Sequence, residues 1–330
     1  MTAPADALTV AVTGPTGTFG HGLLPLLEAD ARVAKVVGIA RRPFDPGQEG
    51  WAKLEYRRGD VRDPDALREA FAGADVVVHL AFLIVGGNAE TTRAINVEGT
   101  LNAFRAAAAA GARRFVYASS VAAYGFHADN PVGMDETWPV RPADKLFYAQ
   151  EKAELEHLLQ EEAARHPELD LYLLRPPVVL GPHTIGAKDL LPGPFAPLTR
   201  RLQGCFRRLP VPVLAGVPAL QLQLVHEDDV GSALLQCVVG AGPAGAYNIA
   251  GDGVLTAVDV ARELGFLPVP LPAAPFQAAA RAVARLPLPS VGGWVEAASH
   301  PAVMDTTKAK EVLGWRPRYT GLEALRDTLR

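Results

Sequence analysis

Residues 8–20 read LTVAVTGPTGTFG, an apolar run that passes directly into a turn containing Gly14, Gly17 and Gly20. The apolar run predicts a buried β-strand, and the glycines predict a tight turn into a helix. Glycines at such a turn let the backbone approach a pyrophosphate, whose negative charge is favoured by the free N–H groups of the helix N-terminus. An ordinary glycine-rich turn is the alternative interpretation.

Four further apolar runs of strand-like composition follow along the chain. They cover residues 33–40, 75–80, 114–118 and 169–174, and helix-like segments separate several of them. Continuous apolar strands that alternate with helices are typical of a parallel sheet covered on both faces. The pattern predicts an α/β fold of the Rossmann type with a doubly wound parallel sheet.

The composition of the sequence changes near residue 181, where Pro and Gly become frequent. The stretches 181–197 and 265–293 are dense in both residues, which predicts irregular, loop-rich structure. We expect a dinucleotide-binding domain over 1–180, with 224–251 returning to the sheet. Residues 181–223 and 252–330 are expected to form a smaller, irregular substrate lobe.

Composition narrows the class of protein. The chain has 330 residues, of which 49% are hydrophobic, and a formal net charge of −4. These values disfavour a disordered chain and a generic nucleic-acid binder, so the expected partner is a small molecule. Cys205 and Cys237 lack the spacing of a metal site or a disulfide framework, and no metal is expected. No apolar run is long enough to span a membrane, and a cytoplasmic protein is expected.

The stretch FYAQEKA at 147–153 places Tyr148 four positions before Lys152. On a helix these two side chains share one face. A fixed positive charge favours the phenolate and lowers the pKa of a tyrosine toward the working range. Such a tyrosine can exchange a proton with an alcohol or a carbonyl, provided that other residues orient the substrate and a hydride carrier is present.

The end of the second predicted strand indicates which cofactor is bound. A dinucleotide domain selective for NAD usually has an acidic residue at this point, which binds the ribose hydroxyls. Here Ala40 is followed by Arg41 and Arg42, and guanidinium groups suit the geometry of a 2′-phosphate. We predict NADP as the cofactor, with NAD as the alternative if the arginines only face solvent.

The motifs taken together resemble the extended short-chain dehydrogenases/reductases, also called the NAD-dependent epimerase/dehydratase family. TGPTGTFG is similar to the cofactor loop of that family, and the resemblance continues over nearly the whole chain. The further matching segments, in the order of the family, are GDVRD (59–63), HLA (79–81), NVEGT (96–100), VYASSVAAYG (116–125), YAQEK (148–152), LRPPVVLGP (174–182), LVHEDDV (224–230), YNIAG (247–251) and KAKEVLGWRP (308–317).

The resemblance implies roles for individual residues. Ser120 would orient the reacting oxygen, Tyr148 would be the general acid/base, and Lys152 would hold the nicotinamide ribose and lower the pKa of the tyrosine. Ser119 is the alternative to Ser120. The residues expected to bind the cofactor are Gly14, Thr16, Gly17, Thr18, Phe19, Gly20, Arg41, Arg42, Asp60, Val61, Leu80, Ala81, Phe82, Asn96, Ser119, Tyr148, Lys152, Pro176 and Val178.

The roles of several other polar residues are less specifically indicated by the sequence. His226 and Asp229 match a family segment that mainly packs a helix start, and His79 is expected to pack at a strand end. Asp135 and Glu136 lie in a loop that either approaches the substrate or carries a solvated charge pair.

Departures from the family patterns narrow the expected reaction. The family's dehydratases carry Thr-Asp-Glu where this chain has Ser120, Val121 and Ala122, so the carboxylates that dehydration needs are absent from that motif. Val178 stands where nucleotide-sugar epimerases have Asn. We predict an NAD(P)-dependent reductase or dehydrogenase that acts on a small, largely apolar carbonyl or secondary alcohol and forms homodimers. A nucleotide-sugar epimerase and a non-catalytic cofactor sensor are the alternatives.

Overall fold

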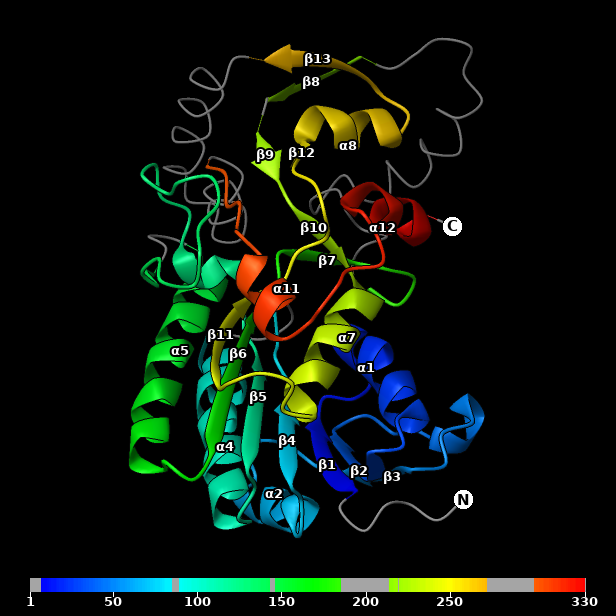
Figure 1. Cartoon of the computed structure of the whole chain (residues 1–330), viewed down its shortest axis with the longest axis vertical. Coiled ribbons are helices and arrows are strands. Elements are labelled where there is room, and N and C mark those ends of the chain that lie inside the picture. Colours follow the sequence, from blue (N-terminus) through cyan, green and yellow to red (C-terminus); the bar gives the residue numbers. More distant parts are fainter. Residues whose placement is uncertain are drawn as a thin grey trace.

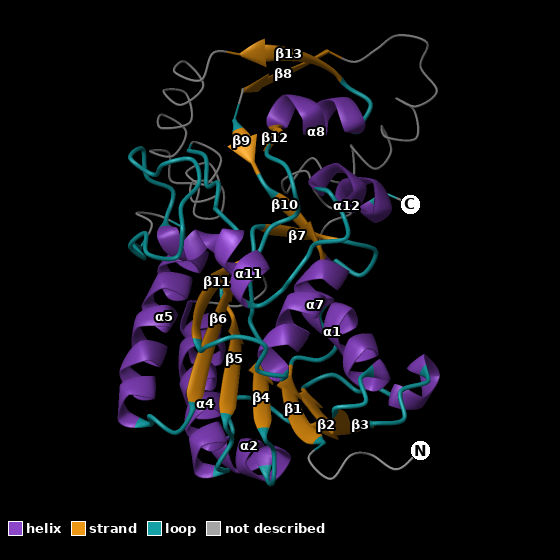
Figure 2. Ribbon diagram, in the orientation of Figure 1, coloured by secondary structure: helices purple, strands orange, loops and turns teal. Residues whose placement is uncertain are grey.

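A seven-stranded parallel sheet forms the centre of the computed structural model, which describes residues 7–84, 89–142, 146–184, 214–218, 220–271 and 300–329. The strands are β1 (Leu8–Thr13), β2 (Val33–Ala40), β3 (Leu54–Arg58), β4 (Val76–His79), β5 (Arg114–Ala118), β6 (Asp170–Arg175) and β11 (Gly245–Asn248). Their order across the sheet is β11-β6-β5-β4-β1-β2-β3, and every neighbouring pair is parallel (Figures 1 and 2). The doubly wound parallel sheet that the sequence predicts is confirmed.

The strands that the sequence analysis did not locate individually lie at the two edges of the sheet. In β3, which reads LEYRR, only Leu54 is buried, so this strand has no continuous apolar run. The four residues of β11 include two that are only partly buried. By contrast, the five predicted strands agree with β1, β2, β4, β5 and β6 to within one residue at each end.

Helices cover both faces of the sheet and produce three layers. One face carries α1 (Thr18–Ala29), α7 (Glu227–Val238) and α11 (Thr307–Val312), and the other carries α2 (Pro64–Phe71), α4 (Gly99–Ala109) and α5 (Phe147–Arg165). Successive residues of β1 point to opposite faces of the sheet, so Val10 and Val12 pack in the core on the first face and Ala11 packs in the core on the second. A strand buried on both faces therefore reads as uniformly apolar.

Short elements join the layers. They are η1 (Pro46–Glu49), α3 (Ala89–Arg93), η2 (Ala94–Glu98), which is a turn of π-helix, and η3 (Val121–Tyr124). Gly111 follows α4 with a φ of +72°, a left-handed conformation that a glycine adopts without steric cost. It ends the helix just after the small-residue run, because a residue with positive φ cannot continue a right-handed helix.

A smaller part of the chain lies beyond the carboxyl ends of the main strands (Figure 1). Three strand pairs form it: β10 (Leu224–His226) with β7 (Val178–Leu180), β12 (Leu255–Thr256) with β9 (Gln221–Leu222), and β13 (Leu267–Leu271) with β8 (Leu214–Pro218). The helices α8 (Ala257–Glu263) and α12 (Gly321–Thr328) accompany them. The proposed domain boundaries stay a prediction.

Parts of the predicted substrate lobe, including Cys205, lie outside the described residues, which omit 185–213 and 272–299. Within the described ranges, no helix combines the length and the apolar character that crossing a bilayer requires.

Candidate active site

The three glycines of the turn between β1 and α1 have different surroundings. Gly14 has a φ of +67°, and a Cβ there would lie 2.8 Å from the backbone N of Ala81. At Gly20, a Cβ would lie only 1.9 Å from the carbonyl oxygen of Pro15. At Gly17, the nearest neighbour of an added Cβ is the Gly14 oxygen at 3.5 Å. Gly14 and Gly20 thus close the turn, whereas Gly17 leaves one face of the backbone open.

The N-terminus of α1 has the character of an anion site. Gly17 is its N-cap residue and provides no side-chain cap for the first N–H groups of the helix, which belong to Thr18 and Phe19. These amides, the helix dipole and the open face at Gly17 fit the diphosphate of a dinucleotide. The turn also lies where the strand order reverses between β1 and β4, the usual ligand position in doubly wound sheets.

Arginines surround the carboxyl ends of β2 and β3, where the adenosine end of a dinucleotide is expected. Arg41 and Arg42 are both exposed. Asp60 forms a bidentate ion pair with Arg62, at 3.1 Å and 2.7 Å, which lowers the pKa of the carboxyl below its ordinary value. Arg58 donates from Nε to the carbonyl oxygen of Arg41 at 3.1 Å.

Arg58 and Arg62 were not among the predicted site residues. Their signal was present in the sequence RRGDVRD at 57–63, which places three arginines beside the two aspartates of the expected adenine segment. Val61 is buried in the same segment, and a Cβ at Gly99 would lie 2.5 Å from its side chain. Val61 is therefore held against the start of α4.

The segment after β4, which contains Leu80, Ala81 and Phe82, is held in place by Asn96. The Asn96 Oδ1 accepts from the Leu83 N–H at 2.7 Å, and its Nδ2 donates to the Leu83 oxygen at 2.9 Å. The same Nδ2 donates to Glu151 of α5 at 2.7 Å. Asn96 is fully buried, so its contacts support the predicted cofactor segment from behind.

Ser120, Tyr148 and Lys152 come together at the carboxyl end of β5. Ser120 caps η3 through its hydroxyl, which accepts from the Ala122 N–H at 3.1 Å, and it also forms a hydrogen bond with the phenol of Tyr148. The buried Lys152 donates from Nζ to the Ala118 oxygen at 2.7 Å and to the Tyr117 hydroxyl at 3.0 Å. The sequence analysis missed Tyr117.

Burial dominates the proton affinities of the pair on α5. It raises the pKa of Tyr148 above its ordinary value, and the hydrogen bond from Ser120 opposes that rise. Burial also lowers the pKa of Lys152 to about 7, against the opposing influence of Glu156 and Glu151. The predicted lowering of the tyrosine pKa by Lys152 is therefore wrong, because the ammonium is directed to Tyr117 and Ala118 and lies 5.9 Å from the centre of the Tyr148 ring.

The two adjacent serines have separate surroundings. The Ser119 hydroxyl donates to Oε1 of Glu156 at 2.5 Å, deep in the protein. Glu156 in turn pairs with Arg175 at 2.5 Å, and both are buried. Since the hydroxyl of Ser119 is bound to this buried ion pair, only Ser120 of the two faces the phenol of Tyr148.

Apolar side chains surround the phenol. Ala122, Leu146, Ala149 and Phe126 form a small cluster with the Tyr148 ring, and Phe82 meets that ring edge-on at a centroid distance of 5.6 Å. Farther out, Val178 begins β7 with 56% of its surface exposed, and the Pro176 oxygen accepts from the Val121 N–H at 2.9 Å. The surroundings of the Tyr148 ring are thus apolar.

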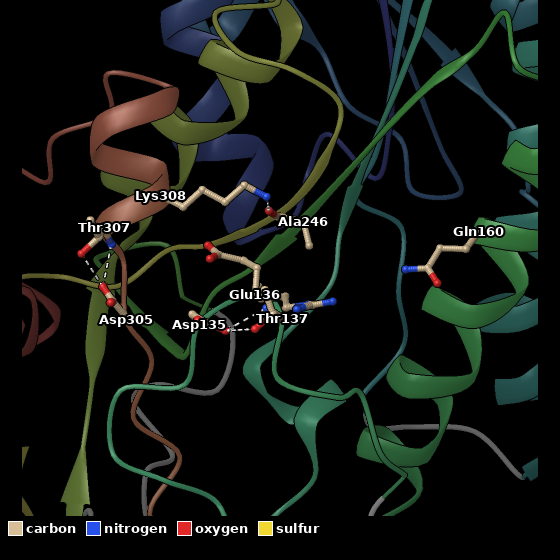
Figure 3. A pocket seen from close by; sticks show the side chains of 9 residues that line it. Asp135, Glu136, Thr137, Gln160, Ala246, Asp305, Thr307 and Lys308 are labelled. Carbon is tan, nitrogen blue, oxygen red and sulfur yellow. Dashed lines mark hydrogen bonds between the residues drawn. The ribbon is translucent and has the colours of Figure 1, made fainter.

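A separate polar pocket lies at the β11 edge of the sheet, with a volume of about 540 Å³. Figure 3 shows Glu136 and Lys308 on one side of it and Gln160 of α5 on the other. Glu136 accepts from the Asn248 N–H at 2.7 Å, and Asp135 accepts from its neighbour Thr137. The loop of Asp135 and Glu136 is therefore fastened to β11.

The histidines that the sequence analysis considered have structural contacts. Both ring nitrogens of His79 bond to threonines, Thr13 at 2.8 Å and Thr100 at 3.0 Å, and burial lowers its pKa to about 3. His226 stacks on Tyr319 with a centroid distance of 3.9 Å. Among the described residues, no group of three His, Cys, Asp or Glu side chains has the arrangement of a metal site.

Comparison with known proteins agrees with this geometry. An uncharacterised protein of Mycobacterium bovis is 29% identical over 99% of this chain and 85% of its own length. The sterol demethylase protein B of Methylococcus capsulatus is 34% identical over 53% of this chain and 52% of its own length. The structure of MoeE5 in complex with UDP-glucuronic acid and NAD superposes with a TM-score of 0.72 at 25% identity, covering 97% of both chains.

The sequence model of one protein family also matches most of the chain, over residues 10–250. Membership of this family supports an enzyme that uses a nicotinamide dinucleotide. The chain belongs to the NAD-dependent epimerase/dehydratase family.

Proposed function

We propose that the protein is an oxidoreductase that transfers hydride between a nicotinamide cofactor and a carbonyl or secondary alcohol of a largely apolar substrate. The observation that carries the proposal is the hydrogen bond between Ser120 and Tyr148, formed inside an apolar cluster and beside the buried Lys152. A cofactor sensor without catalysis would not require this arrangement.

The residues divide the chemistry among them. The Ser120 hydroxyl donates a hydrogen bond to the reacting oxygen of the substrate, and Tyr148 gives a proton to that oxygen during reduction or takes it during oxidation. The buried Lys152, at the carboxyl end of β5, would hold the nicotinamide ribose through its ammonium. The bound nicotinamide supplies or accepts the hydride.

The side chains near Tyr148 favour an apolar substrate over a sugar nucleotide. Phe82, Phe126 and Leu146 lie around the phenol, and Val178 is exposed at the start of β7. Burial of an apolar ligand against such side chains is favourable, whereas sugar hydroxyls would lose hydrogen bonds to water without replacement. The partial similarity to a protein named sterol demethylase protein B agrees with this substrate class.

A nucleotide-sugar epimerase is the second candidate. The similarity to MoeE5, whose structure contains UDP-glucuronic acid and NAD, favours it. An epimerase returns the hydride to the same substrate, so it produces no net change in cofactor oxidation. This difference separates the two candidates experimentally.

The test is a screen of apolar ketones, sterols and secondary alcohols, followed by the absorbance of the reduced nicotinamide, with UDP-glucose and UDP-glucuronic acid assayed in parallel for epimers. We expect turnover with a member of the apolar set, and a loss of at least about a hundredfold in Tyr148→Phe, the lower end of what general acid/base catalysis contributes. Cofactor binding should persist in that variant. Epimers of either sugar nucleotide would place the second candidate first.

We also propose a preference for NADP over NAD, supported by the exposed Arg41 and Arg42 and by the nearby Arg58. A charge-assisted contact with the 2′-phosphate is expected to favour NADP by about tenfold or more in affinity. Calorimetric titration of both cofactors to the wild type and to Arg41→Ala/Arg42→Ala measures this preference. Equal affinities in the wild type would contradict it.

A further inference from the structure

Two histidines stack beside the cofactor turn. His21 lies in α1, four residues after Gly17, and His183 lies in the loop that follows β7. Their ring centroids are 4.5 Å apart and the ring planes differ by 10°. The carbonyl oxygen of His183 accepts a hydrogen bond from the Thr18 hydroxyl at 3.3 Å. The pair therefore joins the turn at the start of α1 to the loop that follows β7.

The pair rests on a buried carboxylate. The Nδ1 of His183 lies 2.7 Å from Oε1 of Glu227, and the backbone N–H of His183 donates to the same oxygen at 3.3 Å. Glu227 begins α7 and is 1% exposed. Within the described residues, its ion-pair partner is His183 and no lysine or arginine. The buried carboxylate of Glu227 therefore holds the His183 ring in its position against His21.

Other charged groups near the pair are few. Glu49 of η1 and Glu227 of α7 both favour the charged form of His21, whereas burial and His183 oppose it and hold its pKa below the ordinary value. Asp228, the neighbour of Glu227, is directed toward His226 and Arg318, at 3.7 Å and 3.9 Å.

We propose that His21, stacked on His183, forms a proton-linked contact for the cofactor diphosphate, so that binding of the cofactor is accompanied by uptake of a proton by His21. The inference rests on the proposed function, because it requires a dinucleotide at the N-terminus of α1. His21 is only about one helical turn from the open backbone of Gly17. Anionic charge placed there favours an imidazolium across that short distance.

The sign of the pH dependence follows from these contacts. The cofactor raises the pKa of His21, and a proton is taken up between the lower pKa of the free protein and the higher pKa of the complex. Cofactor affinity therefore falls as pH rises through this window, and becomes constant above it. A rise of about one pKa unit on binding corresponds to about a tenfold change in affinity across the window.

The experiment is calorimetric titration of NAD at about pH 6, close to the ordinary pKa of histidine, in two buffers that differ in ionisation enthalpy. NAD is the probe because its diphosphate, unlike the 2′-phosphate of NADP, does not titrate in this range. The variant is His21→Asn, which removes the imidazole of His21. His157→Asn is the matched control, because His157 lies on α5 with 74% of its side chain exposed.

We expect proton uptake on NAD binding in the wild type and in His157→Asn, and a loss of most of that uptake in His21→Asn. His21→Asn should bind NAD several-fold more weakly than the wild type at about pH 6 and nearly equally at about pH 8, because the imidazolium is absent at the higher pH. Binding without proton uptake, or undiminished uptake in His21→Asn, would overturn the inference alone. Failure of NAD and NADP to bind at all would reject the proposed function with it.

Discussion

Lys152 illustrates at the scale of one residue how a candidate site can oppose stability. Its side chain is 3% exposed, and burial lowers its pKa to about 7, far below that of a lysine in an unfolded chain. The contacts to Ala118 and Tyr117 and the Phe82 ring, 3.8 Å from Nζ, do not offset the lost hydration of the ammonium. Active sites commonly retain such groups because their chemistry requires them.

The pH dependence of stability tests this description. Between about pH 7 and pH 10, the unfolded chain binds more protons at Lys152 than the folded protein does, so this residue makes stability rise with pH. Lys152→Met removes that rise. Its melting temperature relative to the wild type should be several degrees more favourable at about pH 7 than at about pH 10.

Thermal unfolding of the wild type and of Lys152→Met at both pH values measures the effect. Lys35→Met is the control, because 46% of the Lys35 side chain is exposed. A melting-temperature difference in Lys152→Met that does not change with pH would mean that the ammonium is adequately solvated in the folded protein.

At the scale of elements, β5 and α5 fit together through two periodicities. Residues two apart along an extended strand face the same side, so Tyr117 of β5 and Ser119, the first residue after it, both point at α5. On α5, residues four apart share one face, which presents Lys152 to Tyr117 and Glu156 to Ser119. The strand period and the helix period together place Lys152 opposite Tyr117 and Glu156 opposite Ser119, one helical turn apart on α5.

The contact between α1 and α7 gives a prediction about glycines. A Cβ at Gly231 would lie 2.0 Å from the backbone oxygen of Gly22, so the two helices meet backbone to backbone. Gly231→Ala must separate them and should lower the free energy of unfolding by about 1–3 kcal/mol. Gly17→Ala meets only an ordinary 3.5 Å contact at a φ of −94°, and should leave stability within about 0.5 kcal/mol.

Cofactor binding should separate the two variants in the opposite way. Gly17→Ala, which keeps its stability, is the variant expected to lose affinity for the cofactor. The added methyl of Gly17→Ala occupies the open face of the turn, so its affinity for NAD should fall by about tenfold or more. Denaturant unfolding and calorimetric titration of both proteins give the two quantities. NAD affinity of Gly17→Ala equal to that of the wild type would show that the diphosphate does not use this face.

At the scale of the whole molecule, Asp229 ties the C-terminal segment to the sheet domain. Its buried carboxylate accepts from the backbone N–H groups of Arg318 and Tyr319, at 2.8 Å and 3.0 Å, and its backbone oxygen accepts from the indole of Trp315 at 3.0 Å. His226 adds a contact to Asp327 of α12 at 3.2 Å. The start of α7 therefore holds the final turn and helix in place.

Asp229→Ala should loosen this attachment. Two backbone donors lose their acceptor, which is expected to cost about 1–3 kcal/mol of stability. Amide hydrogen exchange in residues 315–329 should accelerate more than exchange in β1 or β5. Asp228→Ala is the control, because Asp228 is 40% exposed and its charged neighbours are 3.7 Å or more away. Equal exchange in both variants would assign the attachment to apolar packing alone.

Much of the architecture was predictable because it depends on short-range patterns. The five apolar strands are buried on both faces, so each reads as a continuous run, and the glycine turn follows the first of them directly. The edge strand β3 was missed because one of its faces is solvated and Leu54 alone of its residues is buried. In the site, the spacing of Tyr148 and Lys152 was readable because it is a helical repeat within one element.

The sequence by itself determined the fold class, the family, the succession of five strands along the chain and the four-residue helical spacing between Tyr148 and Lys152. Only the tertiary structure decided that Ser120 rather than Ser119 meets the phenol, because the choice depends on Glu156 and the partner that Glu156 finds in Arg175. Likewise, the stack of His21 on His183 joins residues 162 positions apart (183 − 21). Local patterns record the backbone period and the burial of each segment, whereas contacts between distant side chains exist only after the helices and strands have packed.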